Sequence, residues 1–216
     1  MDGKSREDIV AAVSFLEERG LNHGSSGNIS VRTESGILIT PAGARASNLT
    51  EARMVALDLD GSHTDKSEEI PSTEWRLHTE LHRNRSEIGA VVHSHADCCV
   101  ALSCLRKPIP PFHYMVASFG GKTIPCARYE PFGSDALADA VVAAIDGHHG
   151  CLMANHGMIT VGPTLAKALD LAVKLEMLAR QYILACRAGE PVLLNDDEMA
   201  EVHRRYPHYG RARLPR

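Results

Sequence analysis

Two short apolar runs in this chain end in histidine, and both are predicted to be strands of a central sheet. The run 91–95 reads Val-Val-His-Ser-His, and histidines at positions i and i+2 project from the same face of a strand. A second run stops in Asn155-His156-Gly157. Three neutral imidazoles, with one position open for water or substrate, make a catalytic Zn²⁺ site. His93, His95 and His156 are therefore candidate metal ligands, although a single strand histidine is more often a core or rim residue.

The composition is that of a soluble globular protein, with 216 residues of which 44% are hydrophobic and 23% charged. This length favours one domain over residues 1–216. A net charge of −4 gives no broad positive field for nucleic acid, and no run approaches the length of a membrane span. The N-terminus has no apolar signal core, so we expect a cytoplasmic protein. The six cysteines lack disulfide or CxxC spacing, and we expect them to be reduced and buried.

Helical and strand patterns alternate along the chain without a strict βαβ order. This predicts an α/β fold of three layers, with a mixed, largely antiparallel central sheet between two layers of helices. The predicted helices span 5–19, 74–82, 96–105, 136–145, 164–187 and 196–205, and the predicted strands span 29–32, 37–40, 54–57, 91–95, 124–127 and a pair within 150–161.

Three segments rich in Gly, Ser, Thr and Asn offer backbone N–H and hydroxyl groups that suit an anion. They are 25–28, 40–43 and 72–73, although each alone is more often an ordinary turn. Ser72 or Thr73 can cap a helix whose first turn holds Glu74, which delivers a carboxylate at a helix start. His78 and His82 lack the zincin spacing of glutamate, and we interpret them as a partly exposed helix face.

Taken together, the ordered motifs resemble the class II aldolase/adducin family. The resemblance runs from about residue 21 to 210, and it rests on the segments 24–32, 38–43, 71–75, 93–95, 113–115, 131–133 and 155–157.

The resemblance implies a Zn²⁺-dependent reaction, with Co²⁺ or Mn²⁺ as possible metals. The implied reaction cleaves a ketose 1-phosphate into dihydroxyacetone phosphate and an aldehyde. The ketose would be L-fuculose 1-phosphate or a related 5-deoxy or methylthio pentulose 1-phosphate. His93, His95 and His156 match the family's zinc ligands, and Glu74 matches its acid/base residue, which also ligates the metal. Tyr114 matches a tyrosine that acts at a neighbouring subunit's site in a homotetramer.

The resemblance also assigns two substrate-binding regions. Phe132 and Tyr209 fall where the family shapes its aldehyde pocket, and Ala42 and Thr73 replace a threonine and a serine of the family's phosphate site. The positions that align with phosphate binding are Ser25, Gly27, Asn28, Gly43, Ser72 and Thr73.

Other activities of the same fold stay open at this point. Decarboxylases and dehydratases keep a similar metal site, whereas 4-epimerases usually carry aspartate where Glu74 stands. A binding module of the adducin type would lack the zinc histidines, and this chain has all three.

Overall fold

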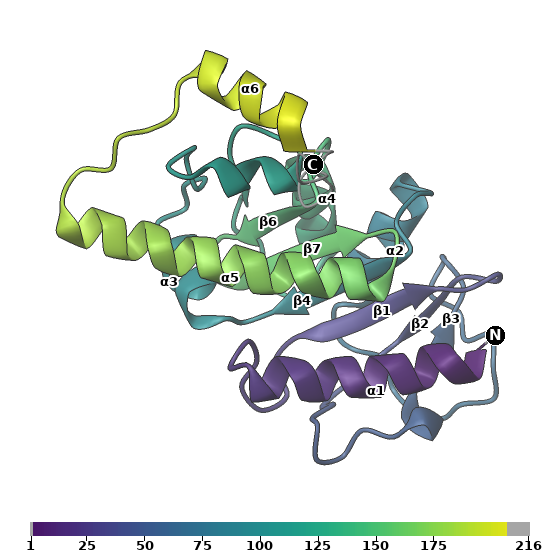
Figure 1. Cartoon of the computed structure of the whole chain (residues 1–216). Helices are drawn as coiled ribbons and strands as arrows, with labels where there is room; N and C mark the ends of the chain where they lie inside the picture. Colours follow the sequence, from purple (N-terminus) through teal and green to yellow (C-terminus); the bar gives the residue numbers. More distant parts are fainter. Residues whose placement is uncertain (1, 207–216) are drawn as a thin grey trace, which may run out of the picture.

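The computed structural model describes residues 2–206, in which seven strands form one sheet in the order β3-β2-β1-β4-β7-β6-β5 (Figure 1). All neighbouring strands are antiparallel except β5 and β6. The predicted mixed, largely antiparallel sheet is confirmed. The strands are β1 (Asn28–Arg32), β2 (Ile37–Ile39), β3 (Val55–Leu57), β4 (Ala90–Ser94), β5 (Cys126–Ala127), β6 (Gly150–Met153) and β7 (Gly157–Gly162).

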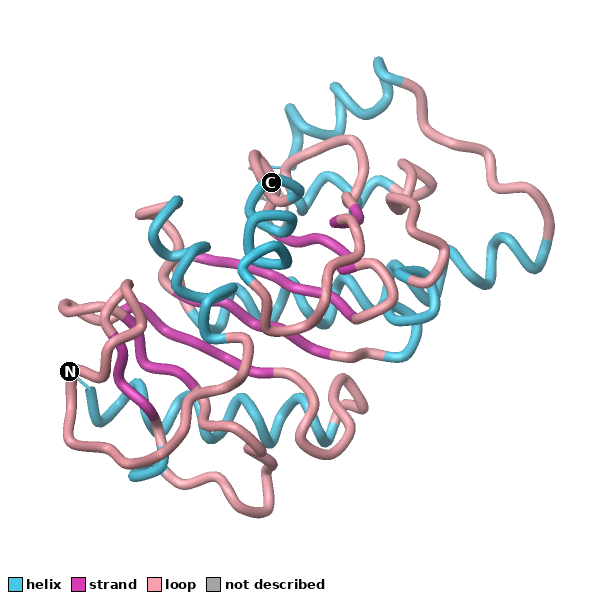
Figure 2. Tube along the Cα trace, turned by 180° about the vertical axis from the view of Figure 1, so that it is seen from behind, coloured by secondary structure: helices cyan, strands magenta, loops and turns pink. Residues whose placement is uncertain are grey.

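Helices cover both faces of this sheet, as Figures 1 and 2 show from opposite sides. One face carries α1 (Asp2–Glu18), α3 (Asp97–Ser103) and α5 (Leu165–Ala188), and the other carries α2 (Trp75–Asn84) and α4 (Asp135–Ala144). Two short 3₁₀ helices, η1 (Glu51–Arg53) and η2 (Tyr114–Phe119), and a final helix, α6 (Asp196–Arg205), complete the described elements.

The central strand β4 is buried on both faces, which explains its continuous apolar sequence. Ala90 and Val92 pack into the core beneath α1, α3 and α5, whereas Val91 packs into the core beneath α2 and α4. Side chains alternate along a strand with a period of two, so His93 lies on the same face as Val91. Strand β4 therefore supports both cores and also carries His93, with His95 directly after the strand end.

Several local predictions need correction. Neither Ser72 nor Thr73 caps α2 with its side chain, because Glu74 itself is the N-cap residue and the helix begins at Trp75. All six cysteines are free, but only Cys99 and Cys151 are buried, whereas Cys98 and Cys126 are half-buried and Cys104 and Cys186 are exposed. Within residues 2–206, none of the helices combines the length and the apolar composition needed to cross a membrane.

Candidate active site

The three predicted histidines converge at one end of the central strands. His93 is the fourth residue of β4, His95 follows the strand end, and His156 lies in the tight turn between β6 and β7. Their ring centroids are 4.9 Å apart in each pair, and the rings are steeply inclined to one another. One nitrogen of each ring lies within 4.8 Å of the others. The set can hold a metal ion.

Backbone conformation at the turn brings His156 to the other two rings. Asn155 adopts a left-handed φ of 52°, which asparagine tolerates better than most residues. A Cβ atom at Gly157 would lie 2.6 Å from the carbonyl oxygen of Ser94 and 3.1 Å from the His95 ring. Glycine therefore permits the close approach of β7 to the end of β4.

Glu74 reaches the same cluster from the start of α2 and is only 5% exposed. Its Oε2 lies 3.2 Å from His93 Nε2 and accepts a hydrogen bond of 2.9 Å from Asn28 Nδ2. Burial alone would raise the pKa of this carboxyl group, but charge on His93 and His156 and the Asn28 hydrogen bond lower it to about 2. At neutral pH the side chain is a carboxylate.

The other carboxylate oxygen, Oε1, accepts no hydrogen bond from the described residues, although it lies 3.3 Å from His156 Nε2. Burial lowers the pKa of both His95 and His156 to about 4, and repulsion from His93 adds to the effect. These imidazoles are neutral at pH 7. Imidazole nitrogens that face one another, beside a buried carboxylate, form the donor set that a divalent cation such as Zn²⁺ prefers.

His93 presents a defined nitrogen to the cluster. Its Nδ1–H donates to the carbonyl oxygen of Met158 over 2.8 Å, which turns Nε2 toward Glu74 and His95. Such a second hydrogen bond is what fixes the ring of a metal-ligating histidine.

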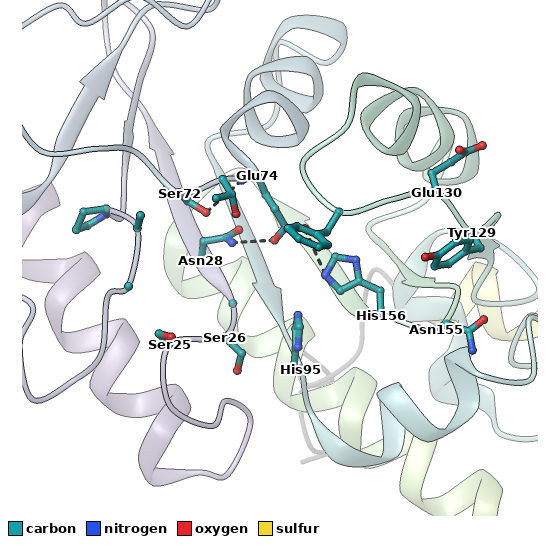
Figure 3. Close-up of a pocket in the computed structure, with 16 residues that line it drawn as sticks. Ser25, Ser26, Asn28, Ser72, Glu74, His95, Tyr129, Glu130, Asn155 and His156 are labelled. Carbon is teal, nitrogen blue, oxygen red and sulfur yellow. Dashed lines mark hydrogen bonds and ion pairs between the residues drawn. The ribbon is translucent and has the colours of Figure 1, made fainter.

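A pocket of about 360 Å³ opens above the histidines (Figure 3). Ser25, Ser26, Asn28 and Ser72 lie on one side, and Tyr129, Glu130 and Asn155 lie on the other. The first side, which we call the small-residue wall, consists of Ser25, Ser26, Gly27, Asn28, Pro41, Ala42, Gly43, Ser72 and Thr73. We call Tyr129, Glu130 and Asn155 on the second side, together with the further lining residue Phe132, the aromatic wall.

The three anion-suited segments predicted from the sequence all meet in the small-residue wall. Backbone hydrogen bonds join two of them, from Ala42 N–H to the Ile70 carbonyl over 2.9 Å and from Ser72 N–H to the Thr40 carbonyl over 3.1 Å. At Gly27, which has a φ of +76°, a Cβ atom would lie 2.7 Å from the His93 carbonyl oxygen. This wall is therefore held tightly against the metal ligands.

The remaining predicted site residues are distributed as follows. Phe132 lies in the aromatic wall and is 75% exposed. Tyr114 begins η2, stacks on the His113 ring at 4.7 Å and does not line this pocket. Tyr209 lies outside residues 2–206.

Sequence reasoning misplaced His78 and His82, which are 0% and 1% exposed rather than partly exposed. Together with Leu77 and Leu81 they form the buried face of α2. That spacing of i, i+1, i+4 and i+5 is the pattern of one helix face and could have identified them as buried.

A cluster of three histidines, an ionised buried carboxylate and an adjoining pocket define a candidate active site of the metal-dependent type. The family model of the class II aldolase and adducin N-terminal domain matches residues 7–183, and the chain belongs to that family.

Several relatives are similar over almost the whole chain. The 5-methylthioribulose-1-phosphate/5-deoxyribulose-1-phosphate aldolase of Rhodospirillum rubrum is 42% identical over 97% of this chain and 95% of its own length. The L-fuculose phosphate aldolase of Escherichia coli K12 is also 42% identical, over 96% of each chain. A solved structure of L-fuculose 1-phosphate aldolase superimposes with a TM-score of 0.89 at 32% identity, covering 94% of this chain and 95% of that one.

Proposed function

We propose that this protein is a metal-dependent aldolase that cleaves a ketose 1-phosphate into dihydroxyacetone phosphate and an aldehyde, with Zn²⁺ as the metal. The observation that carries the proposal is the meeting of His93, His95, His156 and the Glu74 carboxylate beside the small-residue wall. The relatives named above act on 1-phosphates of ketoses, which supports the substrate class.

Breaking the bond between C3 and C4 of a ketose 1-phosphate leaves an electron pair on C3, delocalised onto the C2 oxygen. A bound divalent cation supplies Lewis acidity for that charge. His93, His95 and His156 would hold it, with Glu74 as a further ligand before substrate binds. The chain then needs no Schiff-base lysine.

The protein's own groups carry the protons. In the synthetic direction the Glu74 carboxylate would take a proton from C3 of dihydroxyacetone phosphate, and in cleavage Glu74, protonated from solvent, would return one to C3. Its Oε1 is the oxygen without a competing hydrogen bond among the described residues. Tyr114 would exchange a proton with the C4 oxygen, at the site of a neighbouring subunit in a homotetramer. Each such positioned proton transfer typically contributes about 10²–10⁴-fold to the rate.

The small-residue wall would bind the phosphate through Ser25, Gly27, Asn28, Gly43, Ser72 and Thr73. Relative to the family's phosphate site, Ala42 in place of threonine removes one hydroxyl from this wall, whereas Thr73 in place of serine keeps one. Phe132, with Tyr209, would contact the aldehyde portion.

The test is a coupled assay for dihydroxyacetone phosphate release by the metal-loaded protein. The panel contains the 1-phosphates of L-fuculose, L-rhamnulose, 5-deoxyribulose and methylthioribulose. Release that a chelator abolishes and Zn²⁺ restores is the expected result. No release from any ketose, with metal bound, would contradict an aldolase and favour a decarboxylase, a dehydratase or an epimerase.

A further inference from the structure

Glu74 is one end of a buried chain of hydrogen bonds that joins α2 to β1. The other members are Asn28, His78, Ser30 and His82, and the last three are at most 1% exposed. His78, Ser30 and His82 do not line the pocket, so no substrate atom can touch them. Buried polar groups of this kind are costly unless every one is satisfied.

The contacts run in sequence from the carboxylate. Asn28 Nδ2 lies 2.9 Å from Glu74 Oε2, and His78 Nε2 lies 2.5 Å from Asn28 Oδ1. Ser30 Oγ then lies 2.7 Å from His78 Nδ1 and 3.0 Å from His82 Nε2. Each pair can share one hydrogen.

The ionised carboxylate fixes the direction of donation, because it can only accept. Asn28 must therefore turn its NH₂ group to Glu74 and its oxygen to His78, so His78 carries a hydrogen on Nε2. Burial lowers the pKa of His78 to about 3, so Nδ1 of this neutral ring accepts from the Ser30 hydroxyl. Ser30 in turn accepts from Nε2–H of His82.

At the far end of the chain, the single hydrogen of neutral His82 has two possible acceptors: Ser30 Oγ, 3.0 Å from Nε2, and the Ile88 carbonyl oxygen, 3.2 Å from Nδ1. The Ile88 oxygen also accepts from Arg32 Nε over 2.8 Å, and the direction set at the Glu74 end places the His82 hydrogen on Nε2. The opposite tautomers would leave no hydrogen between His78 Nε2 and Asn28 Oδ1, which form the shortest contact. The hydrogens therefore all point toward Glu74.

We propose that His78 is a positioning residue of the aldolase: by donating from Nε2 to Asn28 Oδ1, it turns the Asn28 amide so that Nδ2–H holds Oε2 of Glu74. Oε1 is thereby left for proton transfer. This inference rests on the proposed function, in which Glu74 exchanges a proton with C3.

The kinetic test compares His78→Leu, which removes both hydrogen bonds, with His78→Gln, whose amide can donate to Asn28 and accept from Ser30. We expect His78→Leu to lower kcat about 10²-fold while KM changes little, since misplacing a catalytic group by about 1 Å has this effect. His78→Gln should recover most of the loss. His63→Leu, at an exposed histidine that does not line the pocket, is the matched control and should keep wild-type kcat.

A double-mutant cycle separates positioning from general structural damage. If His78 acts through Asn28, then His78→Leu should add little to the loss already caused by Asn28→Ala. The inference would be overturned if the two losses in kcat multiplied in the double mutant, or if His78→Leu kept the wild-type kcat.

A second readout needs neither activity nor metal. In ¹⁵N imidazole spectra of the metal-free wild-type protein, His78 should be protonated on Nε2, and a ring protonated on Nδ1 alone would overturn the proposal. This measurement decides the matter even if His78→Leu fails to fold. Absence of aldolase activity in the wild type, with the Nε2 proton present, would instead refute the proposed function.

Discussion

The two walls of the pocket are built in different ways. The small-residue wall consists of side chains no larger than asparagine or proline, and backbone hydrogen bonds between the segments 40–42 and 70–72 hold it in place. In the aromatic wall, Tyr129 and Phe132 are 51% and 75% exposed, and the guanidinium group of Arg106 lies over the Tyr129 ring at 5.4 Å. The first wall suits a group common to all substrates, whereas the second suits a group that varies. We infer that phosphate recognition and aldehyde selection reside in separate walls.

The largest expected effect comes from the histidines beneath both walls. His95→Ala should lose bound metal and all measurable cleavage, because two imidazoles no longer form a catalytic ligand set. Metal analysis and dihydroxyacetone phosphate release measure the two losses. His63→Ala is the control, and cleavage that survives in a metal-free His95→Ala would contradict the role of the cluster.

Glu74→Gln should separate metal binding from proton transfer. The amide keeps nearly the same shape but cannot exchange a proton with C3, so we expect kcat to fall about 10²–10⁴-fold while most of the metal stays bound. Full turnover in this variant would refute the assignment of Glu74 as the acid/base residue.

The buried chain of hydrogen bonds that includes His78 predicts a loss of stability in acid. Burial lowers the pKa of His78 from 6.5 to about 3. Between these two pH values His78 is therefore protonated in the unfolded chain and neutral in the folded chain. The free energy of unfolding of the metal-free protein should fall by about a few kcal/mol as the pH falls from 6.5 toward 3. Glu74, whose pKa is lowered from 4.5 to about 2, adds a loss only below pH 4.5.

Denaturant unfolding across this pH range measures the effect. His78→Gln has no titrating group at this position, so its stability should decline less steeply than that of the wild type. Parallel curves for the two proteins would show that His78 does not titrate in this way.

A smaller effect is expected from hydroxyl groups in the small-residue wall. Thr73→Ala should raise KM for ketose 1-phosphates about tenfold, because a hydrogen bond to a charged group contributes about 1.5 kcal/mol or more. Ala42→Thr should lower KM by adding a hydroxyl group to the same wall. Equal KM values in all three proteins would place the phosphate elsewhere.

The smallest effect concerns the aromatic wall. Phe132→Ala should change the ratio of kcat/KM values between different ketose 1-phosphates about tenfold, since apolar contacts discriminate substrates by about 1–3 kcal/mol. Stability should hardly change, because the ring is 75% exposed. A uniform loss for all ketoses would show that this wall does not select the aldehyde.

Local sequence patterns determined the central strands of this protein and the position of two candidate ligands. The apolar runs around Val91 and Leu152 predicted buried strands, and the spacing of His93 and His95 predicted two ligands on one face. The two strands and the proximity of the two rings are confirmed, because a strand places alternate side chains on the same face wherever it occurs in a fold. Metal binding by these rings stays a prediction. The family motifs also identified most of the segments that meet in the pocket, although 113–115 does not line it.

Only the tertiary structure decided which polar residues are buried together. His78, Ser30 and Asn28 are separated by up to 50 residues, and each alone resembles an ordinary helix or strand residue. Their function depends on the packing of α2 against β1, where water is excluded and each hydrogen must find an acceptor among the neighbours. Sequence periodicity gives the face of a single element, whereas the direction of hydrogen bonds across two elements depends on which groups meet there.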